Sequence, residues 1–205
     1  DPFEGAERLV EAYGLGELSP NTYLVGDSEV PDHRDAYCRM IARFHEGRRN
    51  VVILHYNAEL RCGRRERIDV WWGGLKSNGG LMLTLAYLLQ TSVAWRGADL
   101  RVKMVVPTPE AAAGAQPNLE AIVGSMRSGA TAEVLVSDGR PFVEIMKESS
   151  RGVDFILLGM REPDDGFQAY YERMRDAVEG MPTAAFVLAA EDMPFGEIVV
   201  NPEGD

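Results

Sequence analysis

Short apolar runs rich in β-branched residues recur along the chain and alternate with longer stretches of helical pattern. This alternation is typical of a mostly parallel sheet with helices on its faces. Most runs are continuously apolar, as expected of strands that are covered on both faces. The predicted strands are Thr22–Gly26, Val51–Tyr56, Ile68–Trp72, Leu100–Val106, Ala132–Val136, Phe155–Gly159 and Ala184–Ala190. The sequence therefore predicts an α/β fold.

Five helices are predicted between these strands, so one strand follows another directly. The helices are Arg34–Glu46, Gly80–Trp95, Asn118–Ser128, Pro141–Glu148 and Gly166–Met181. The direct step joins Val51–Tyr56 to Ile68–Trp72, and we expect these two strands to pair as a hairpin. The stretch Ala111–Pro117 is expected to be a loose surface connection. We expect residues 1–21 to form a lead-in segment and residues 22–205 to complete one α/β domain.

Charge is distributed unevenly along the chain and excludes one class of partner. The net charge is −11, which argues against nucleic acid because phosphate binding needs a basic surface. Residues 1–137 hold 17 acidic and 15 basic side chains, whereas residues 138–205 hold 15 and 6. The longest weakly polar run, Gly79–Trp95, is too short to span a bilayer. No direct membrane insertion is therefore expected.

Motifs for catalysis, metals and cofactors are missing from the sequence. The chain contains no Gly-Lys dipeptide, hence no phosphate loop, and no Gly-x-Ser-x-Gly elbow. Gly14-Leu15-Gly16 has Ser19 at the third glycine position of a dinucleotide fingerprint and precedes the first strand. Cys38 and Cys62 are not spaced as a metal or redox pair. We predict no cofactor, no metal and no catalytic residue.

Three polar features allow two interpretations each. His55, at the end of an apolar strand, is either an active-site residue or a partly buried structural histidine. The acidic groups Glu162–Asp165 and Glu191–Asp192 follow strands, and a solvated loop is favoured over a catalytic edge. The arginine-rich loop 61–67, with Arg48 and Arg49, is either an anion or lipid-headgroup site or an exposed hairpin tip, and we favour the exposed tip.

Three ordered stretches carry a more specific signal. They are 14–22 (Gly-Leu-Gly-Glu-Leu-Ser-Pro-Asn-Thr), 68–72 (Ile-Asp-Val-Trp-Trp), and Gly79-Gly80-Leu81 at the head of a leucine-rich helix. Together they resemble the C-terminal cytoplasmic domain of the cation-chloride cotransporter family, in a prokaryotic type of member. Asp99–Val102 and Val153–Met160 extend the resemblance, although Arg161-Glu162-Pro163 replaces the immediate proline of the family's Met-Pro turn. The motif residues are Gly14, Gly16, Pro20, Asn21, Ile68, Asp69, Trp71, Trp72, Gly79 and Gly80.

The resemblance implies a regulatory domain on the cytoplasmic face of the cell membrane. It implies a fold similar to universal stress proteins, a non-catalytic role, self-association as a homodimer, and attachment to a transmembrane transport domain absent from this chain. The alternative is a nucleotide-binding module of the universal-stress type, which the acidic residues after Gly159 disfavour. Under the cotransporter interpretation, residues 138–205 are expected to face away from the anionic leaflet, with the arginine loop nearer to it.

Two aromatic and apolar surfaces are candidates for contacts. Trp71 and Trp72 point to opposite faces of a strand, so one ring can enter the core while the other packs beneath a helix or against a partner. The alternative, which we favour, is that both rings are simply core residues. On the Gly80–Trp95 helix, a stripe of Met82, Ala86, Leu89 and Val93 adjoins a stripe of Leu81, Leu85 and Leu88. The apolar arc is wider than one sheet face requires. The part of this arc that does not face the sheet is covered either by a neighbouring helix of the chain, which we favour, or by another subunit.

Overall fold

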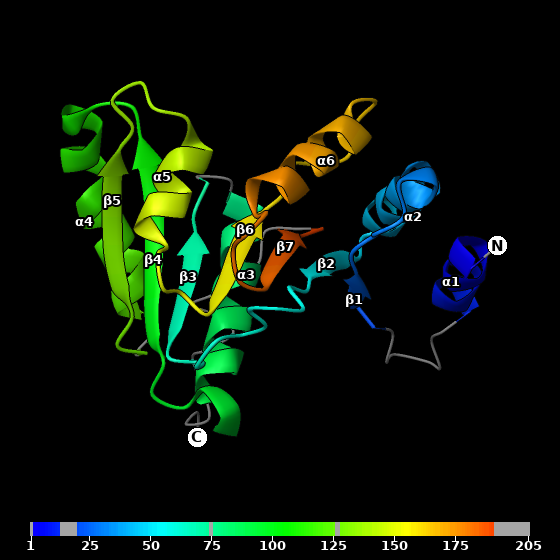
Figure 1. Ribbon diagram of the computed structural model, residues 1–205, viewed down its shortest axis with the longest axis horizontal. Coiled ribbons are helices and arrows are strands. Elements are labelled where there is room, and N and C mark those ends of the chain that lie inside the picture. Colours follow the sequence, from blue (N-terminus) through cyan, green and yellow to red (C-terminus); the bar gives the residue numbers. More distant parts are fainter. Residues whose placement is uncertain (1, 13–19, 74–75, 126–127, 191–205) are drawn as a thin grey trace, which may run out of the picture.

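The computed structural model describes residues 2–12, 20–73, 76–125 and 128–190. Within them the strands form a seven-stranded sheet in the order β1-β2-β7-β6-β3-β4-β5 (Figure 1). The strands are β1 (Thr22–Gly26), β2 (Asn50–His55), β3 (Arg67–Trp71), β4 (Asp99–Val106), β5 (Thr131–Val136), β6 (Phe155–Gly159) and β7 (Ala184–Leu188). Every neighbouring pair is parallel except β2 and β7. The predicted α/β fold with a mostly parallel sheet is confirmed.

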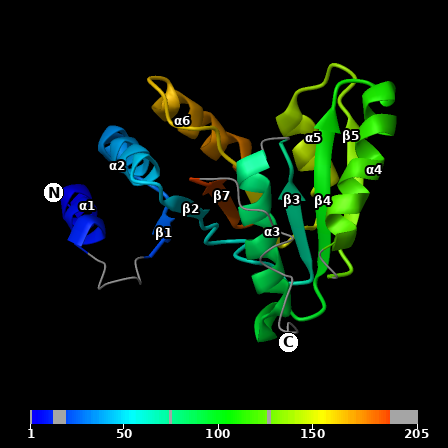
Figure 2. The same cartoon turned by 180° about the vertical axis from the view of Figure 1, so that it is seen from behind.

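Helices cover both faces of the sheet and create two separate cores. One face carries α2 (Arg34–Glu46), α5 (Phe142–Ser149) and α6 (Phe167–Ala177), with α1 (Pro2–Ala12) packed on α2. The other carries α3 (Lys76–Thr91) and α4 (Pro109–Ser125), as the view from behind shows (Figure 2). No helix in the described residues is long and apolar enough to cross a membrane.

The predicted hairpin between the second and third strands is wrong. β2 pairs with β1 and β7, whereas β3 pairs with β4 and β6, so two strands lie between them. Residues 56–66 instead cross the sheet edge beneath β7 and β6. The backbone N–H of Thr183 donates to the carbonyl of Arg61 at 3.0 Å, and that of Asp154 to the carbonyl of Arg67 at 3.0 Å.

Two helix boundaries also differ from the prediction. Ala111–Pro117 lies inside α4 and is not a loose connection, because its alanines favour helix and outweigh Gly114 and Pro117. The leucine-rich helix begins at Lys76, earlier than Gly80, and ends at Thr91. A short 3-10 helix, η2 (Val93–Trp95), follows it.

Candidate functional site

The motif residue Asp69 lies in a buried ionic cluster between the sheet and α5. Its side chain is fully buried on β3. The Nε of Arg101 donates to Asp69 Oδ1 at 2.7 Å, and the Oγ of Ser150 donates to Oδ2 at 2.6 Å. Lys103 Nζ lies 3.3 Å from the same Oδ2. The carboxylate therefore links two neighbouring strands to the end of α5.

Lys103 completes this cluster from β4. Only 1% of its side chain is exposed, and its Nζ donates to the carbonyl and the Oγ of Ser149 at 2.7 and 2.6 Å. Glu133 of β5 lies 3.3 Å from Nζ on the other side. Because a buried ammonium group is tolerated only with such partners, the cluster fixes the placement of α5 on three strands.

The two tryptophans lie on opposite faces of the sheet, as predicted. Trp71 is buried, and its Nε1 donates to Ser150 Oγ at 3.1 Å on the α5 side. The Trp72 ring packs against α3, where a Cβ built on Gly79 would lie 2.3 Å from Trp72 Cη2. Gly79 is thus required where the indole ring crosses the first turns of α3.

Some of the apolar side chains in the two α3 stripes are buried in the core, and others are exposed at the surface. Met82 and Ala86 are buried in the core beneath α3, so neither side chain is available to a partner. Leu89 is half-buried against the same core. Leu88 and Val93 are 58% and 89% exposed. An interface on this helix therefore remains a prediction for its carboxyl-terminal end alone.

The other motif residues lie in the core, directly before the first strand, or outside the described residues. Ile68 is fully buried in β3, Gly80 is buried in α3, and Pro20 and Asn21 lead directly into β1. Gly14 and Gly16 lie outside the described residues, as do Glu191 and Asp192.

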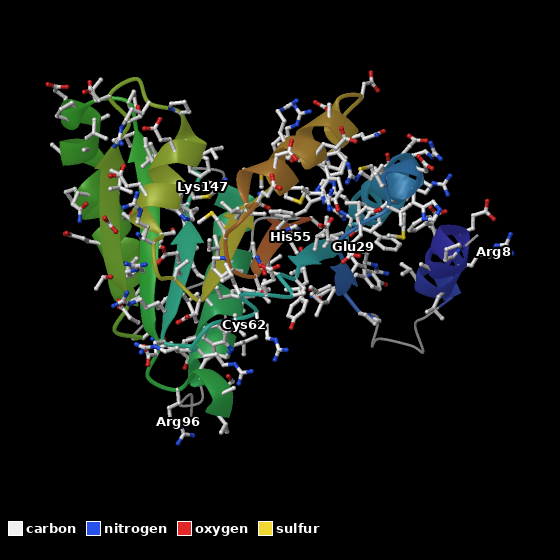
Figure 3. All side chains as sticks on the ribbon, viewed as in Figure 1. Arg8, Glu29, His55, Cys62, Arg96 and Lys147 are labelled. Atoms are coloured by element: carbon white, nitrogen blue, oxygen red, sulfur yellow. The ribbon has the colours of Figure 1, made fainter. Side chains whose placement is uncertain are left out.

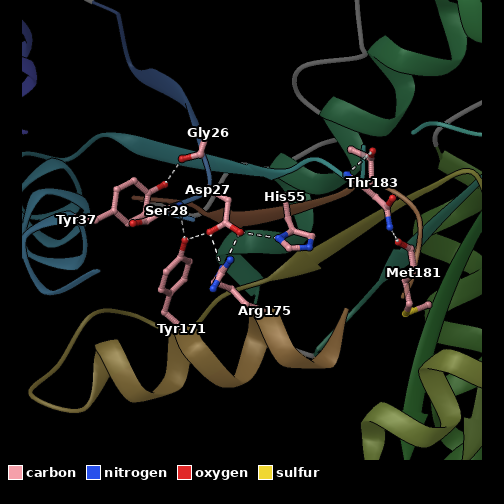
Figure 4. A network of polar contacts seen from close by, with 10 residues as sticks. Gly26, Asp27, Ser28, Tyr37, His55, Tyr171, Arg175, Met181 and Thr183 are labelled. Atoms are coloured by element: carbon pink, nitrogen blue, oxygen red, sulfur yellow. Dashed lines mark hydrogen bonds and ion pairs between the residues drawn. The ribbon is translucent and has the colours of Figure 1, made fainter. Parts of the chain in front are cut away.

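His55 belongs to a network at the ends of β1 and β2 (Figure 4). Its Nδ1 lies 2.6 Å from Asp27 Oδ2, to which Arg175 Nε also donates at 2.7 Å. The hydroxyl of Tyr171 donates to Asp27 Oδ1 and accepts from the backbone N–H of Ser28. The interpretation of His55 as a structural histidine is favoured, because the carboxylate beside it is engaged by α6 and β2 together.

The same contacts perturb the acidity of Asp27. Burial opposes its ionisation, but hydrogen bonds from His55, Tyr171 and Arg175 outweigh burial and lower its pKa to about 2. Burial raises the pKa of Tyr171, so its hydroxyl stays protonated and keeps donating to the carboxylate. The network therefore holds α6 against β1 and β2 while Asp27 is ionised.

This depressed pKa predicts a loss of stability in acid. Asp27 stabilises the fold above its unfolded pKa of 3.8, and the contribution of about 2 kcal/mol disappears as the pH falls through 2. Urea unfolding of the native chain and of Asp27→Asn, measured between pH 6 and pH 2, is expected to show their difference shrinking as the pH falls. Asp35→Asn, at an exposed ion pair, is the control. A difference independent of pH would contradict this assignment.

The carboxyl ends of β6 and β7 form a hollow where α/β sheets commonly bind ligands. The hollow measures about 340 Å³, and Arg161, Glu162 and Asp164 contribute to its lining. Asn78 of α3, also in the lining, already donates to the carbonyl of Met160 and accepts from the N–H of Ala189. Asp164 accepts from the N–H of Gly166 at 2.9 Å, which supports the loop interpretation of this acidic group. The hollow offers a phosphate two carboxylates and one arginine.

The arginine-rich loop lies at the edge of the sheet opposite this hollow, and hydrogen bonds hold its backbone in place. The buried carboxylate of Asp154 accepts from the backbone N–H groups of Arg64, Glu66 and Arg67 at 2.7 to 3.0 Å. Gly63 adopts a φ of +43°, and a Cβ there would lie 1.9 Å from Asp154 Oδ1. Arg48 and Arg49 precede β2, which runs antiparallel to β7, so they lie at the other edge of the sheet.

Comparisons with known proteins were made for sequence and for structure. No family model matches the chain. Over 100 residues it is 29% identical to potassium/chloride cotransporter 3 of Caenorhabditis elegans, covering 46% of this chain and 9% of that protein. The crystal structure of the cytoplasmic domain of a prokaryotic cation chloride cotransporter superposes with a TM-score of 0.73. That match covers 97% of this chain and 73% of the other, at 18% identity.

The chain resembles the cytoplasmic domain of cation chloride cotransporters. This resemblance, predicted from the motifs, is confirmed in sequence and in fold. A universal stress protein from Archaeoglobus fulgidus DSM 4304 also superposes, with a TM-score of 0.58 at 12% identity over 94% of this chain and 67% of that one. The predicted universal-stress-like fold of the cotransporter-like domain is therefore confirmed as well.

Sequence reasoning missed the polar residues that organise this cotransporter-like domain. Asp27, Tyr171, Arg175 and Asp154 were not singled out, because their partners lie far away in sequence. A signal existed only for Lys103, a charged residue in the middle of the apolar run Leu100–Val106. Groups of His, Cys, Asp and Glu that could hold a metal do not occur among the described residues.

Proposed function

We propose that this chain is the non-catalytic cytoplasmic domain of a secondary transporter similar to the cation chloride cotransporters. The observation that carries the proposal is the joint match, in sequence to a potassium/chloride cotransporter and in fold to a prokaryotic cotransporter's cytoplasmic domain. The chain spans 9% of the length of the worm cotransporter, so transport of ions would rest with a membrane domain outside it. Its place would be the cytoplasmic face of the membrane.

The gene tests this proposal directly. We expect the reading frame ahead of the codon for Asp1 to encode a series of membrane-spanning segments. Vesicles containing the whole product should show cation uptake that depends on chloride. A reading frame without such segments, or uptake indifferent to chloride, would contradict the cotransporter assignment.

Regulation and self-association as a homodimer form the second part of the proposal. Leu88 near the carboxyl-terminal end of α3 and Val93 in the following η2 are exposed and support a contact surface there. Sedimentation velocity of the domain at increasing concentration is expected to show a dimer that Val93→Glu weakens. Leu9→Glu on α1, 63% exposed in the native chain, is the matched control. A monomer at all concentrations would remove self-association and leave the cotransporter assignment standing.

The alternative function is nucleotide binding, which the universal-stress-like fold favours. Against it, the loop after β6 places Glu162 and Asp164 in the hollow where phosphates would lie. Titration calorimetry with ATP is expected to detect no binding in the micromolar range. Micromolar binding would replace the regulatory proposal with a nucleotide-sensing one.

A further inference from the structure

Basic side chains gather at the amino-terminal ends of the parallel strands. Seven exposed residues form this surface, the basic edge: Arg61, Arg64, Arg65, Arg67, Arg96, Lys147 and Arg151. They meet there because β6, β3 and β4 are parallel neighbours and each is preceded by an arginine. Figure 3 shows Arg96 at the lower end of the molecule, Cys62 of the arginine-rich loop above it, and Lys147 higher still, beside α5.

The loop that supplies four of these arginines is built with a fixed backbone. The carboxylate of Asp154 accepts hydrogen bonds from three backbone N–H groups of the loop, and Gly63 fits only without a side chain. Arg61 and Arg65 have positive φ angles of 53° and 62°, which costs free energy and turns the chain sharply. The arginine side chains therefore project from a pre-organised backbone.

A hollow of about 360 Å³ opens within the basic edge. Lys147 and Arg151 line it together with Leu60, which is 49% exposed, and with three glycines of positive φ, Gly63, Gly152 and Gly180. Cationic groups around an apolar side chain match the interfacial region of a bilayer, where headgroup phosphates lie beside acyl chains.

The charges around the hollow favour an anionic partner. Carboxylates also lie in the same segments as the basic edge, namely the exposed Glu59, Glu66, Asp99, Glu148 and Glu179 and the buried Asp154. Of the seven residues of the basic edge, only Arg64 forms a close ion pair with one of these carboxylates, at 2.5 Å from Glu66. Because this pair is exposed to water, it contributes little free energy. At the opposite edge, near the carboxyl ends of β4, β5 and β6, Glu110, Asp138, Glu162, Asp164 and Asp165 outnumber Arg140 and Arg161, whereas Arg48 and Arg49 lie at that edge before β2.

We propose that the basic edge binds the headgroups of anionic phospholipids in a bilayer and thereby orients the domain beneath the membrane. The proposal rests on the assignment as a transporter's cytoplasmic domain. The acidic carboxyl edge is repelled from an anionic leaflet while the basic edge is attracted, so one orientation is selected.

Vesicle sedimentation tests this proposal on the chain itself. The native chain is expected to sediment with vesicles containing phosphatidylserine at about 0.1 M salt, to be released at about 1 M salt, and to ignore pure phosphatidylcholine. Each basic residue near such a surface strengthens binding about fivefold, so Arg64→Glu with Arg65→Glu should weaken it at least about 25-fold.

A matched variant carries the same change of net charge elsewhere. Arg8→Glu with Arg173→Glu alters two exposed arginines on α1 and α6, and it should reduce binding far less. Equal thermal unfolding of both variants shows that the fold is intact.

Equal weakening by both variants, or no binding by the native chain, overturns the proposal. Release by millimolar inorganic phosphate at constant ionic strength also overturns it, in favour of a soluble-anion site. The reading-frame and uptake results are unaffected by any of these outcomes.

Discussion

Replacing Asp69 with alanine is expected to lower the free energy of unfolding by about 3–5 kcal/mol, because it leaves the buried Lys103 and the partly buried Arg101 without their shared counter-ion. Urea unfolding followed by tryptophan fluorescence measures the loss. Trp71 reports on the same region, because Lys103 Nζ lies 5.5 Å from the centre of its ring.

Two further variants separate charge from packing at this cluster. Asp35→Ala removes an exposed ion pair with Arg39 and should change stability by about 0.5 kcal/mol or less. Replacing Asp69 and Lys103 together with leucine and methionine should recover much of the loss, because the fully buried ammonium group is then removed with its counter-ion, while Arg101 keeps 20% of its side chain exposed to water. If Asp69→Ala costs no more than Asp35→Ala, the cluster does not contribute as described.

Gly79→Ala is expected to destabilise the domain by about 1–3 kcal/mol, although alanine favours helix over glycine by about 1 kcal/mol. The new Cβ would lie 2.3 Å from the Trp72 ring, so α3 or the ring must move. Thermal and urea unfolding of the variant measure the cost.

A second helical glycine provides the matched control. Gly114 lies inside α4 with nothing within 4 Å of a Cβ, so Gly114→Ala should stabilise the domain by about 0.5–1 kcal/mol. In a Trp72→Leu background, the penalty of Gly79→Ala should shrink, since the clashing ring is gone. Equal effects of Gly79→Ala and Gly114→Ala on stability would show that the Trp72 ring can move aside without a loss in the free energy of unfolding.

The sequence predicted the strands well because burial on both faces leaves continuous apolar runs. All seven predicted strands occur, whereas the contact of the Trp72 ring with Gly79 was not predicted. Pairing between strands was harder to predict. The short path from β2 to β3 suggested a hairpin, but β3 gains two parallel partners and full burial by pairing with β4 and β6.

The polar clusters were not predictable because their members are distant in sequence. Asp27 contacts Arg175 and Tyr171, which lie on the last helix. Asp154 organises a loop about ninety residues earlier in the chain. Only the folded sheet brings these groups together, so neither residue type nor local spacing marks them.

The antiparallel junction of β2 with β7 sets a time order for folding during synthesis. His55 and its partner Ala184 are about 130 residues apart, a separation that slows folding because loop closure must precede pairing. At about 5–20 residues per second, β2 leaves the ribosome roughly 6–26 seconds before β7 is available. During that interval β2 can pair only with β1, and the arginine that binds Asp27 has not yet been synthesised. The strand that joins the two parts of the sheet is also the last of the described strands to be synthesised.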